Sequence, residues 1–168
     1  MLIDHRAHVD DDSQLGDGTK VWQFASVIRG AVLGANCVVG ACANIDGARL
    51  GSGCRVGHGA SLHPGLLAGD EVFFGPGAIV CNDPWPRVRA TDFDLKKLLD
   101  GFVCVRIGSQ ASIGAGAIVL PGRKIGSSAM ISAGAVVEID VPPGYLLKRN
   151  GELVEIDRRQ IAHMREAS

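Results

Sequence analysis

The sequence predicts an all-β protein built as a parallel β-helix, and two regularities carry this prediction. An aliphatic or other apolar residue stands at every sixth position over residues 9–80, with one step of five between Ile45 and Leu50, and the period resumes over residues 107–137. A small residue, such as Ala25, Ala43 or Ala111, stands two positions before most of these apolar residues. A six-residue period is typical of β-helices, in which each repeat is one strand and one corner.

The hexad also predicts the cross-section. Residues two apart on a strand point to the same side, so the apolar and the small position share the interior. A glycine often follows the apolar residue and permits the backbone of a sharp corner. Three hexads close a triangular coil of 18 residues, and the repeats suffice for about six coils stacked roughly 4.8 Å apart.

The period breaks once and then ends. Residues 82–104 are predicted to form an extruded loop, because Pro84 and Pro86 cannot continue a coil and residues 91–94 resemble a capping box before a short helix over 95–99. Long loops in compact proteins are usually functional or disordered, so this loop is the first place to expect a site. We expect a β-helix domain over 1–143 and a cap over 144–168, with a hairpin around a two-residue turn at Asn150-Gly151 and a final helix from Asp157.

Composition narrows the class of protein. The chain has 17 basic and 18 acidic residues, which favours neither nucleic acid nor a membrane surface as a partner. No run approaches the roughly 18 apolar residues of a membrane helix, and the N-terminus shows no signal peptide. The five cysteines form no CxxC pair, and Cys37 and Cys54 occupy the small interior position. We therefore expect a cytoplasmic protein with no metal site.

Residues 9–143 resemble the hexapeptide-repeat acyltransferases, and within them the enzymes that acylate nucleotide-linked 3-amino sugars. The resemblance rests on Val21-Trp22-Gln23-Phe24, Phe73-Phe74-Gly75-Pro76, Asn82-Asp83, Pro86-Arg87 and Asp140-Val141-Pro142-Pro143. It implies a left-handed β-helix, a homotrimer with sites between subunits, and acetyl transfer from acetyl-CoA to the amino group of a nucleotide-linked sugar. Acetyl transfer to oxygen stays open as an alternative acceptor chemistry.

The resemblance also implies site residues. Asn82 corresponds to an active-site asparagine of that branch, and His58 or His63 would orient or deprotonate the acceptor. Asp83, Arg87 and Trp22 would bind the substrate, Arg87 by a bidentate contact to phosphate. The alternatives are a turn role for Asn82 and solvated surface positions for the two histidines.

A second set of residues is expected to bind the coenzyme. The small corner residues would leave room for a pantetheine arm, and three cations would neutralise its phosphates. The corner residues are Gly114, Ala115, Gly116, Ala133 and Gly134, and the cations are Arg123, Lys124 and Lys148. Alternatively, these glycines only make turns and these charges are only solvated.

Two other classes of function remain open. The spacing of His58 and His63, with Val27-Ile28-Arg29-Gly30, also resembles the γ-class carbonic anhydrases, which bind zinc through three histidines of adjacent subunits. Here Ala31 replaces an acidic residue of that family, and Trp22 stands near the place of its third histidine. A catalytic zinc needs three protein ligands. The chain can also be a trimeric scaffold without catalytic activity.

Overall fold

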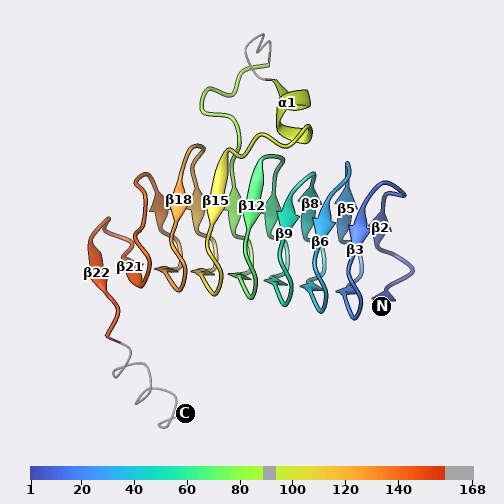
Figure 1. The fold of residues 1–168 in the computed structure, drawn as a ribbon, viewed down its shortest axis with the longest axis horizontal. Helices are drawn as coiled ribbons and strands as arrows, with labels where there is room; N and C mark the ends of the chain where they lie inside the picture. The colour runs from blue at the N-terminus through green and yellow to red at the C-terminus, as the bar shows by residue number, and fades with distance from the viewer. Residues whose placement is uncertain (89–93, 158–168) are drawn as a thin grey trace.

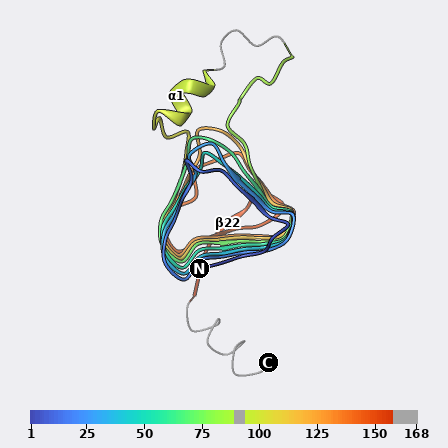
Figure 2. The same cartoon turned by 90° about the vertical axis from the view of Figure 1, so that its right-hand side faces the viewer.

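The chain folds into a three-sided prism wound from short strands, as Figures 1 and 2 show in a computed structural model that describes residues 1–88 and 94–157. The strands form three sheets, one on each side of the prism. Sheet A contains β1 (Leu2–Ile3), β4 (Lys20–Val21), β7 (Val38–Val39), β10 (Arg55–Val56), β13 (Phe73–Phe74), β16 (Ser112–Ile113), β19 (Met130–Ile131), β21 (Tyr145–Leu147) and β22 (Leu153–Glu155).

The other two sheets complete the triangle. Sheet B contains β2 (His8–Val9), β5 (Ser26–Ile28), β8 (Asn44–Asp46), β11 (Ser61–Leu62), β14 (Ile79–Val80), β17 (Ile118–Val119) and β20 (Val136–Val137). Sheet C contains β3 (Gln14–Leu15), β6 (Val32–Leu33), β9 (Arg49–Leu50), β12 (Leu66–Ala68), β15 (Val105–Ile107) and β18 (Lys124–Ile125). The chain passes through the sheets in the order A, B, C, and we name the edges between them AB, BC and CA.

The strand register confirms the predicted coil. Leu2 pairs with Lys20, eighteen residues further on, in parallel orientation. Sheet A holds eight strands in parallel register, β1 to β21, so the chain makes about eight turns. The prediction of about six coils is wrong because it counted only the hexads of residues 9–80 and 107–137, whereas strands at Leu2–Ile3 and Tyr145–Leu147 extend the prism at both ends.

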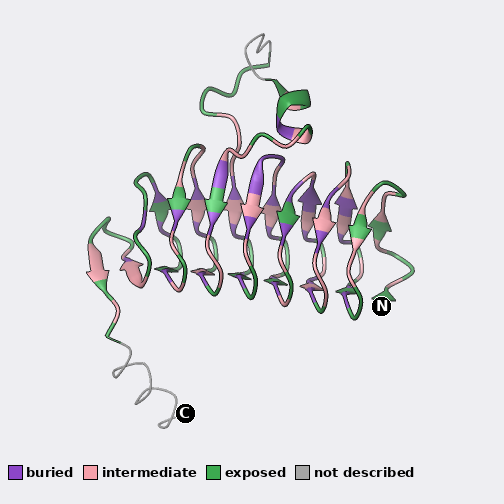
Figure 3. Cartoon of the chain, viewed as in Figure 1, coloured by how far each residue is buried: buried purple, intermediate pink, exposed green. Residues whose placement is uncertain are grey.

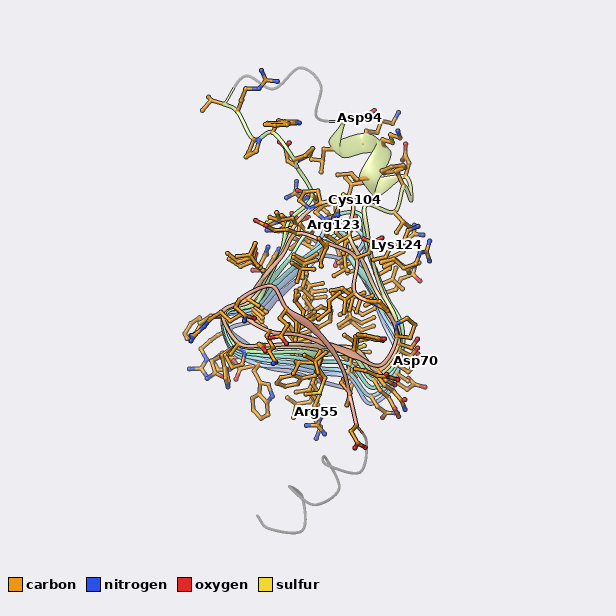
Figure 4. The ribbon with its side chains drawn as sticks, turned by 90° about the vertical axis from the view of Figure 1, so that its left-hand side faces the viewer. Arg55, Asp70, Asp94, Cys104, Arg123 and Lys124 are labelled. Carbon is orange, nitrogen blue, oxygen red and sulfur yellow. The ribbon has the colours of Figure 1, made fainter. Side chains whose placement is uncertain are left out.

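The helix is left-handed, as the resemblance implies. Figure 4 looks at the C-terminal end, so the chain advances toward the reader. The labelled residues give the path: Asp70 at the right-hand CA edge, Arg55 below on sheet A, and Arg123 at the upper BC edge before the chain enters sheet C. This path is clockwise, and a coil that approaches the viewer clockwise is left-handed. Parallel crossovers usually have the opposite hand.

The interior is a column of the two inward positions of each hexad. The apolar series is fully buried at Val27, Ile45 and Leu62, and the small series at Ala60 and at Cys37. Figure 3 shows buried segments that recur in the strands from coil to coil, and exposed segments in many of the corners. The predicted core is therefore confirmed along most of the prism.

One loop leaves the prism at the BC edge, between β14 and β15, and rises above it in Figure 1. It carries the single helix of the described residues, α1 (Leu95–Leu99), which begins at the predicted residue. Asp94 caps it, since its Oδ1 accepts the Lys97 N–H at 2.9 Å. Leu98 is buried, so the helix folds back onto the prism and does not project freely.

The C-terminal hairpin joins β21 to β22 and continues sheet A. Its predicted two-residue turn is wrong: Lys148 N–H donates to Glu152 O, so three residues form the connection, with Gly151 at φ 85°. A glycine in this conformation is typical of three-residue hairpin loops. The division of the chain at residue 143 stays a prediction, and the expected final helix lies almost wholly outside the described residues. None of the described helices has the length and apolar character needed to span a membrane.

Candidate functional site

The predicted site residues lie on different parts of the prism. His63, Asn82, Asp83, Arg87 and Arg123 belong to the BC edge and its loop. At or level with the AB edge stand His58, Trp22, Gly114, Ala115, Gly116, Ala133, Gly134 and Lys148. Lys124 lies on the face of sheet C. Within one chain the structure therefore brings only part of the predicted set together.

The BC edge brings His63 and Asn82 onto neighbouring coils. Leu62 pairs with Val80, so the residues that follow these two strands lie side by side. Asn82 Nδ2 donates to Pro64 O at 3.2 Å, which fixes the carboxamide beside the corner that carries His63. The His63 ring places Nε2 3.1 Å from Ser61 Oγ. A histidine and an asparagine thus lie on neighbouring coils at the edge where the loop leaves the prism.

The environment of His63 favours its neutral form. Burial lowers the pKa of the imidazole below its ordinary value, because a partly desolvated ring is harder to charge. The Arg29 guanidinium acts in the same direction, and the Asp46 carboxylate opposes both. A half-buried, neutral imidazole has the properties of a general base near neutral pH.

Sequence reasoning missed Asp46 and its partner Arg29. Asp46 is one of two buried polar or charged residues in the described part of the chain, and its Oδ2 forms an ion pair with Arg29 Nη2. Its other oxygen, Oδ1, is buried and has no hydrogen-bond partner among the described residues. The signal was present in the sequence, since Asp46 follows Ile45, where the six-residue period loses one residue.

A pocket of about 470 Å³ lies between the loop and the prism. Asn82, Asp83, Trp85 and Cys104 line it from the ends of the loop, and α1 contributes Lys97 and Leu98. Asp83 Oδ1 also accepts the Trp85 N–H at 2.8 Å, which shapes the start of the loop. Asn82 and Asp83 therefore face a space large enough for part of a small-molecule substrate.

Trp85, Pro86 and Arg87 line a second hollow of about 430 Å³ on the exposed part of the loop. This places the predicted phosphate-binding Arg87 close to the larger pocket along the chain. The whole predicted substrate set except Trp22 thus belongs to the loop.

The AB edge carries His58 and exposed aromatic rings. His58 Nδ1 accepts the Ala41 N–H at 3.0 Å, so its proton is on Nε2, which is directed away from that bond. Trp22 is 41% exposed and Phe24, two residues on, is 60% exposed. The Arg6 guanidinium lies 5.2 Å from the centre of the Phe24 ring. Phe24 is a surface residue that sequence reasoning did not single out as a site residue.

The small residues of the AB edge have two different roles. A Cβ at Gly114 would lie 2.4 Å from Ala133 N, so glycine is required there for coils to stack. A Cβ at Gly116 would meet nothing within 4 Å, and its φ of 64° explains the glycine by the turn alone. Coil stacking accounts for Gly114 and the turn accounts for Gly116, and a pantetheine path along this edge stays a prediction.

The three predicted phosphate ligands do not converge within the chain. Arg123 donates to Pro121 O and Glu138 O at the BC edge. Lys148 Nζ pairs with Glu152 Oε2 at 3.1 Å. Lys124 extends from sheet C, on a different side of the prism, as Figure 4 shows. A joint role in binding one coenzyme would require a neighbouring subunit.

The two histidines of the carbonic anhydrase alternative also lie apart. His58 is at the AB edge and His63 at the BC edge of the same coil, so one metal ion cannot take both from one chain. Among residues 1–88 and 94–157, no three His, Cys, Asp or Glu side chains converge in a geometry suited to a metal.

Comparisons with known proteins agree with the repeat. The family model for bacterial transferase hexapeptide (six repeats) matches residues 12–47. The bifunctional protein GlmU of Thermosynechococcus vestitus is 30% identical over 142 residues, which is 84% of this chain and 28% of GlmU. The chain thus spans little more than a quarter of that relative.

Solved structures share the fold. The acetyltransferase domain of PglB from Neisseria gonorrhoeae has a TM-score of 0.54 and 24% identity, over 92% of this chain and 57% of that one. A variant of perosamine N-acetyltransferase from Caulobacter crescentus, in complex with CoA and GDP-perosamine, has a TM-score of 0.53 and 21% identity, over 93% of this chain and 58% of that one. The N-acyltransferase AntD from Bacillus cereus, in complex with dTDP and 3-hydroxybutyryl-CoA, has a TM-score of 0.61 and 15% identity, over 98% of this chain and 84% of that one.

At these identities the likeness establishes the fold. The chain spans less than two thirds of the first two structures. The predicted resemblance to hexapeptide-repeat proteins is confirmed by the family match and by the fold together.

Proposed function

We propose that this hexapeptide-repeat β-helix is an acyltransferase that moves an acetyl group from acetyl-CoA to the amino group of a nucleotide-linked sugar. The observation that carries the proposal is the hydrogen bond from Asn82 Nδ2 to Pro64 O, which ties Asn82, at a pocket of about 470 Å³, to the residue that follows His63. Support comes from proteins of the same fold, whose solved structures contain CoA with GDP-perosamine in one case and dTDP with 3-hydroxybutyryl-CoA in another.

His63 is the proposed base. Because burial favours its neutral form, the ring can accept a proton from the acceptor nitrogen near neutral pH. The nitrogen lone pair attacks the thioester carbonyl carbon, and a tetrahedral oxyanion forms. When the oxyanion collapses, the C–S bond breaks and coenzyme A leaves as a thiolate. His63 then donates the proton that it took from the acceptor nitrogen to this thiolate.

Asn82 is the proposed positioning group for the acceptor. Its Nδ2 is engaged by Pro64 O, which leaves the carbonyl oxygen to accept a hydrogen bond from the acceptor amine. A fixed acceptor of this kind aligns the nitrogen toward the thioester and so lowers the entropic part of the barrier. Asp83 and Arg87 would contact the sugar and its phosphates from the loop.

The active assembly is proposed to be a homotrimer. The outward residue that precedes the buried apolar residue is never Lys, Arg, Asp or Glu in sheet B, whereas at this position sheet A presents Lys20 and Arg55 and sheet C presents Arg49, Arg106 and Lys124. In sheet B this residue is His8, Ser26, Asn44, Ser61, Ile79, Ile118 or Val136. An uncharged face suits a subunit interface. A cyclic trimer pairs different surfaces of each subunit, so the AB edge of one chain can complete the BC edge of the next.

The test is an acetyl-transfer assay that follows free coenzyme A thiol with a panel of nucleotide-linked amino sugars. His63→Asn is expected to lower kcat/KM by at least about 100-fold, because it removes the base but keeps a polar side chain. His5→Asn is the matched control, since the side chain of His5 is 85% exposed at the N-terminus, away from the loop. Full activity of the His63→Asn protein would contradict the assignment, and absence of coenzyme A binding by the unaltered protein would favour the scaffold alternative.

A further inference from the structure

The BC edge has one corner that is a residue shorter than its neighbours. Leu33 pairs with Leu50, seventeen residues further on, whereas the pairs before it are eighteen apart. Only Gly47 and Ala48 separate β8 from β9, and Ala48 takes the buried small position. The connection from sheet B to sheet C is therefore shorter at this corner than in the coil before it.

The loop helix packs against that short corner. A Cβ at Gly47 would lie 2.6 Å from Leu99 Cδ2 and 3.3 Å from Pro64 Cγ. At the next corner, a Cβ at Gly65 would lie 2.8 Å from Leu98 Cδ2. Two glycines therefore admit Leu98 and Leu99 of α1, and the helix covers the corners that carry Asp46 and His63.

Asp46 is buried at this covered corner. Its side chain is 5% exposed, whereas the corresponding residues of the neighbouring coils, Ile28, His63 and Cys81, are only half-buried. Arg29 satisfies Oδ2, and Oδ1 has no partner among the described residues. A buried carboxylate oxygen without a partner is costly, so a role for Oδ1 in the working protein is expected.

His63 is the neighbour that can use it. Leu62 pairs with Ile45, so His63 lies directly beside Asp46 on the adjacent coil. Nε2 of His63 is near Ser61 Oγ, and Nδ1 has no hydrogen-bond partner in the described part of the chain. Adjacent coils thus present a ring nitrogen and a carboxylate oxygen that both lack partners.

We propose that Asp46 is the positioning residue of His63: its carboxylate, which forms an ion pair with Arg29, orients the ring through Nδ1–H and stabilises the imidazolium that forms when Nε2 takes the acceptor's proton. Asp46 stays an anion throughout, and the proton moves only between the acceptor nitrogen, His63 and the leaving thiolate. This inference rests on the proposed function of His63 as the base.

Few charged groups act on His63. Asp46 and Arg29 are the two that influence its pKa, the first upward and the second downward. Cys81 faces it from the following coil, and burial raises the pKa of that thiol, so the sulfur is neutral near pH 7. The substitutions Asp46→Asn and Arg29→Gln should therefore move the pKa of His63 in opposite directions, whereas loss of packing alone would not produce opposite signs.

The experiment is an NMR titration of the His63 ring in the full chain without substrate. In the Asp46→Asn protein the pKa of His63 should fall by about one unit, because the anion is lost and the Arg29 charge is left uncompensated; Arg29→Gln should raise it. Asp70→Asn is the matched control, since Asp70 lies at the CA edge and contacts Ser52 and Ser109. An unchanged or raised pKa in Asp46→Asn, or the same sign in both variants, would overturn the proposal. If the Asp46→Asn protein does not fold, the pKa of His63 in the Arg29→Gln protein decides: a rise supports the proposal, and an unchanged or lowered pKa contradicts it.

Kinetics separate this inference from the proposed function. If the unaltered protein transfers acetyl groups, the acid limb of kcat/KM in Asp46→Asn should move to lower pH with the His63 pKa, and its plateau should fall. An active enzyme whose titration shows no such shifts contradicts the role of Asp46 alone. A protein that shows the shifts but transfers nothing contradicts the proposed function and leaves the pairing of Asp46 with His63 intact.

Discussion

The CA edge and the BC edge are made from the same hexads, yet only one of them departs from the repeat. At the CA edge every corner is alike: a Cβ at Gly34 or Gly51 would meet the backbone of the next coil within 3 Å, and Ser52, Asp70 and Ser109 link successive coils. The BC edge loses one residue after Asp46 and gains a long loop before β15, where Leu66 pairs with Val105, thirty-nine residues further on.

The difference shows where a solenoid has room for chemistry. The stacked coils are filled by buried aliphatic and small side chains, and a regular edge presents only turns. The short corner after Asp46 and the loop before β15 lie together at the BC edge. The short corner makes room for α1, and the loop supplies the pocket. A break in a repeat is thus a stronger indication of a site than any single residue within it.

The largest expected effect comes from making the BC edge regular. Replacing residues 84–102 by a Gly-Ser link should reduce acetyl transfer at least about 100-fold, because the pocket and the cover over His63 are lost. The prism should stay folded, since its core lies in the coils. Circular dichroism and the transfer assay together check this, and retained activity would show that the loop is not part of the site.

A charge on sheet B should act nearly as strongly. Ile118→Glu places a carboxylate on the uncharged face and should convert the trimer into monomers in sedimentation velocity, with about a tenfold or greater loss of activity. Val32→Glu, an equivalent change on the outward face of sheet C, is the matched control. Equal behaviour of the two variants would contradict sheet B as the interface.

A change at the CA edge should affect stability alone. Gly34→Val brings a side chain against Ser52 N, which would lie 2.5 Å from the Cβ, and should cost about 3 kcal/mol in the free energy of unfolding. The activity of the folded protein should be unchanged, because this edge carries no part of the proposed site. Denaturant unfolding measures the free energy of unfolding, and the transfer assay measures the activity. A fall in kcat without a fall in stability would contradict a purely structural role for the CA edge.

The smallest effect concerns the first coil, far from both departures. A bidentate contact from Arg6 lowers the pKa of Asp4 from 3.8 to about 2. Because the folded-state pKa is depressed, the stabilisation is fully present above about pH 4 and is lost as pH falls through about 2. Hydrogen exchange of the Asp4 and Arg6 amides should rise over that range while the BC edge stays protected, and the carboxyl titration of Asp4 by NMR checks the pKa.

Much of the fold follows from the sequence because the hexad is a local rule. The apolar and small positions, the coil of eighteen residues and the loop at 82–104 could all be predicted from period and proline placement. Handedness could not be predicted from the residues, since the general preference is for the right hand, and the number of coils was missed because the end strands depart from the pattern.

The candidate site was predicted less completely. Asn82 and His63 could be chosen from the resemblance, but their position at one edge depends on the strand register. The single step of five residues within the six-residue period makes this register hard to predict. Asp46 was missed because an aspartate after a strand reads as a solvated corner residue. The next residue, Gly47, packs against Leu99 of α1, about fifty residues further along the chain, and such long-range packing leaves no local sequence signal.

The most direct test of the central claim is a crystal structure of the protein with coenzyme A and a nucleotide-linked amino sugar. The account predicts that the coenzyme sulfur and the sugar nitrogen meet at the BC edge, within reach of His63 Nε2 and the Asn82 carboxamide, with the AB edge of a neighbouring subunit closing the site. A coenzyme bound at the CA edge, or a sugar nitrogen remote from His63, would contradict it.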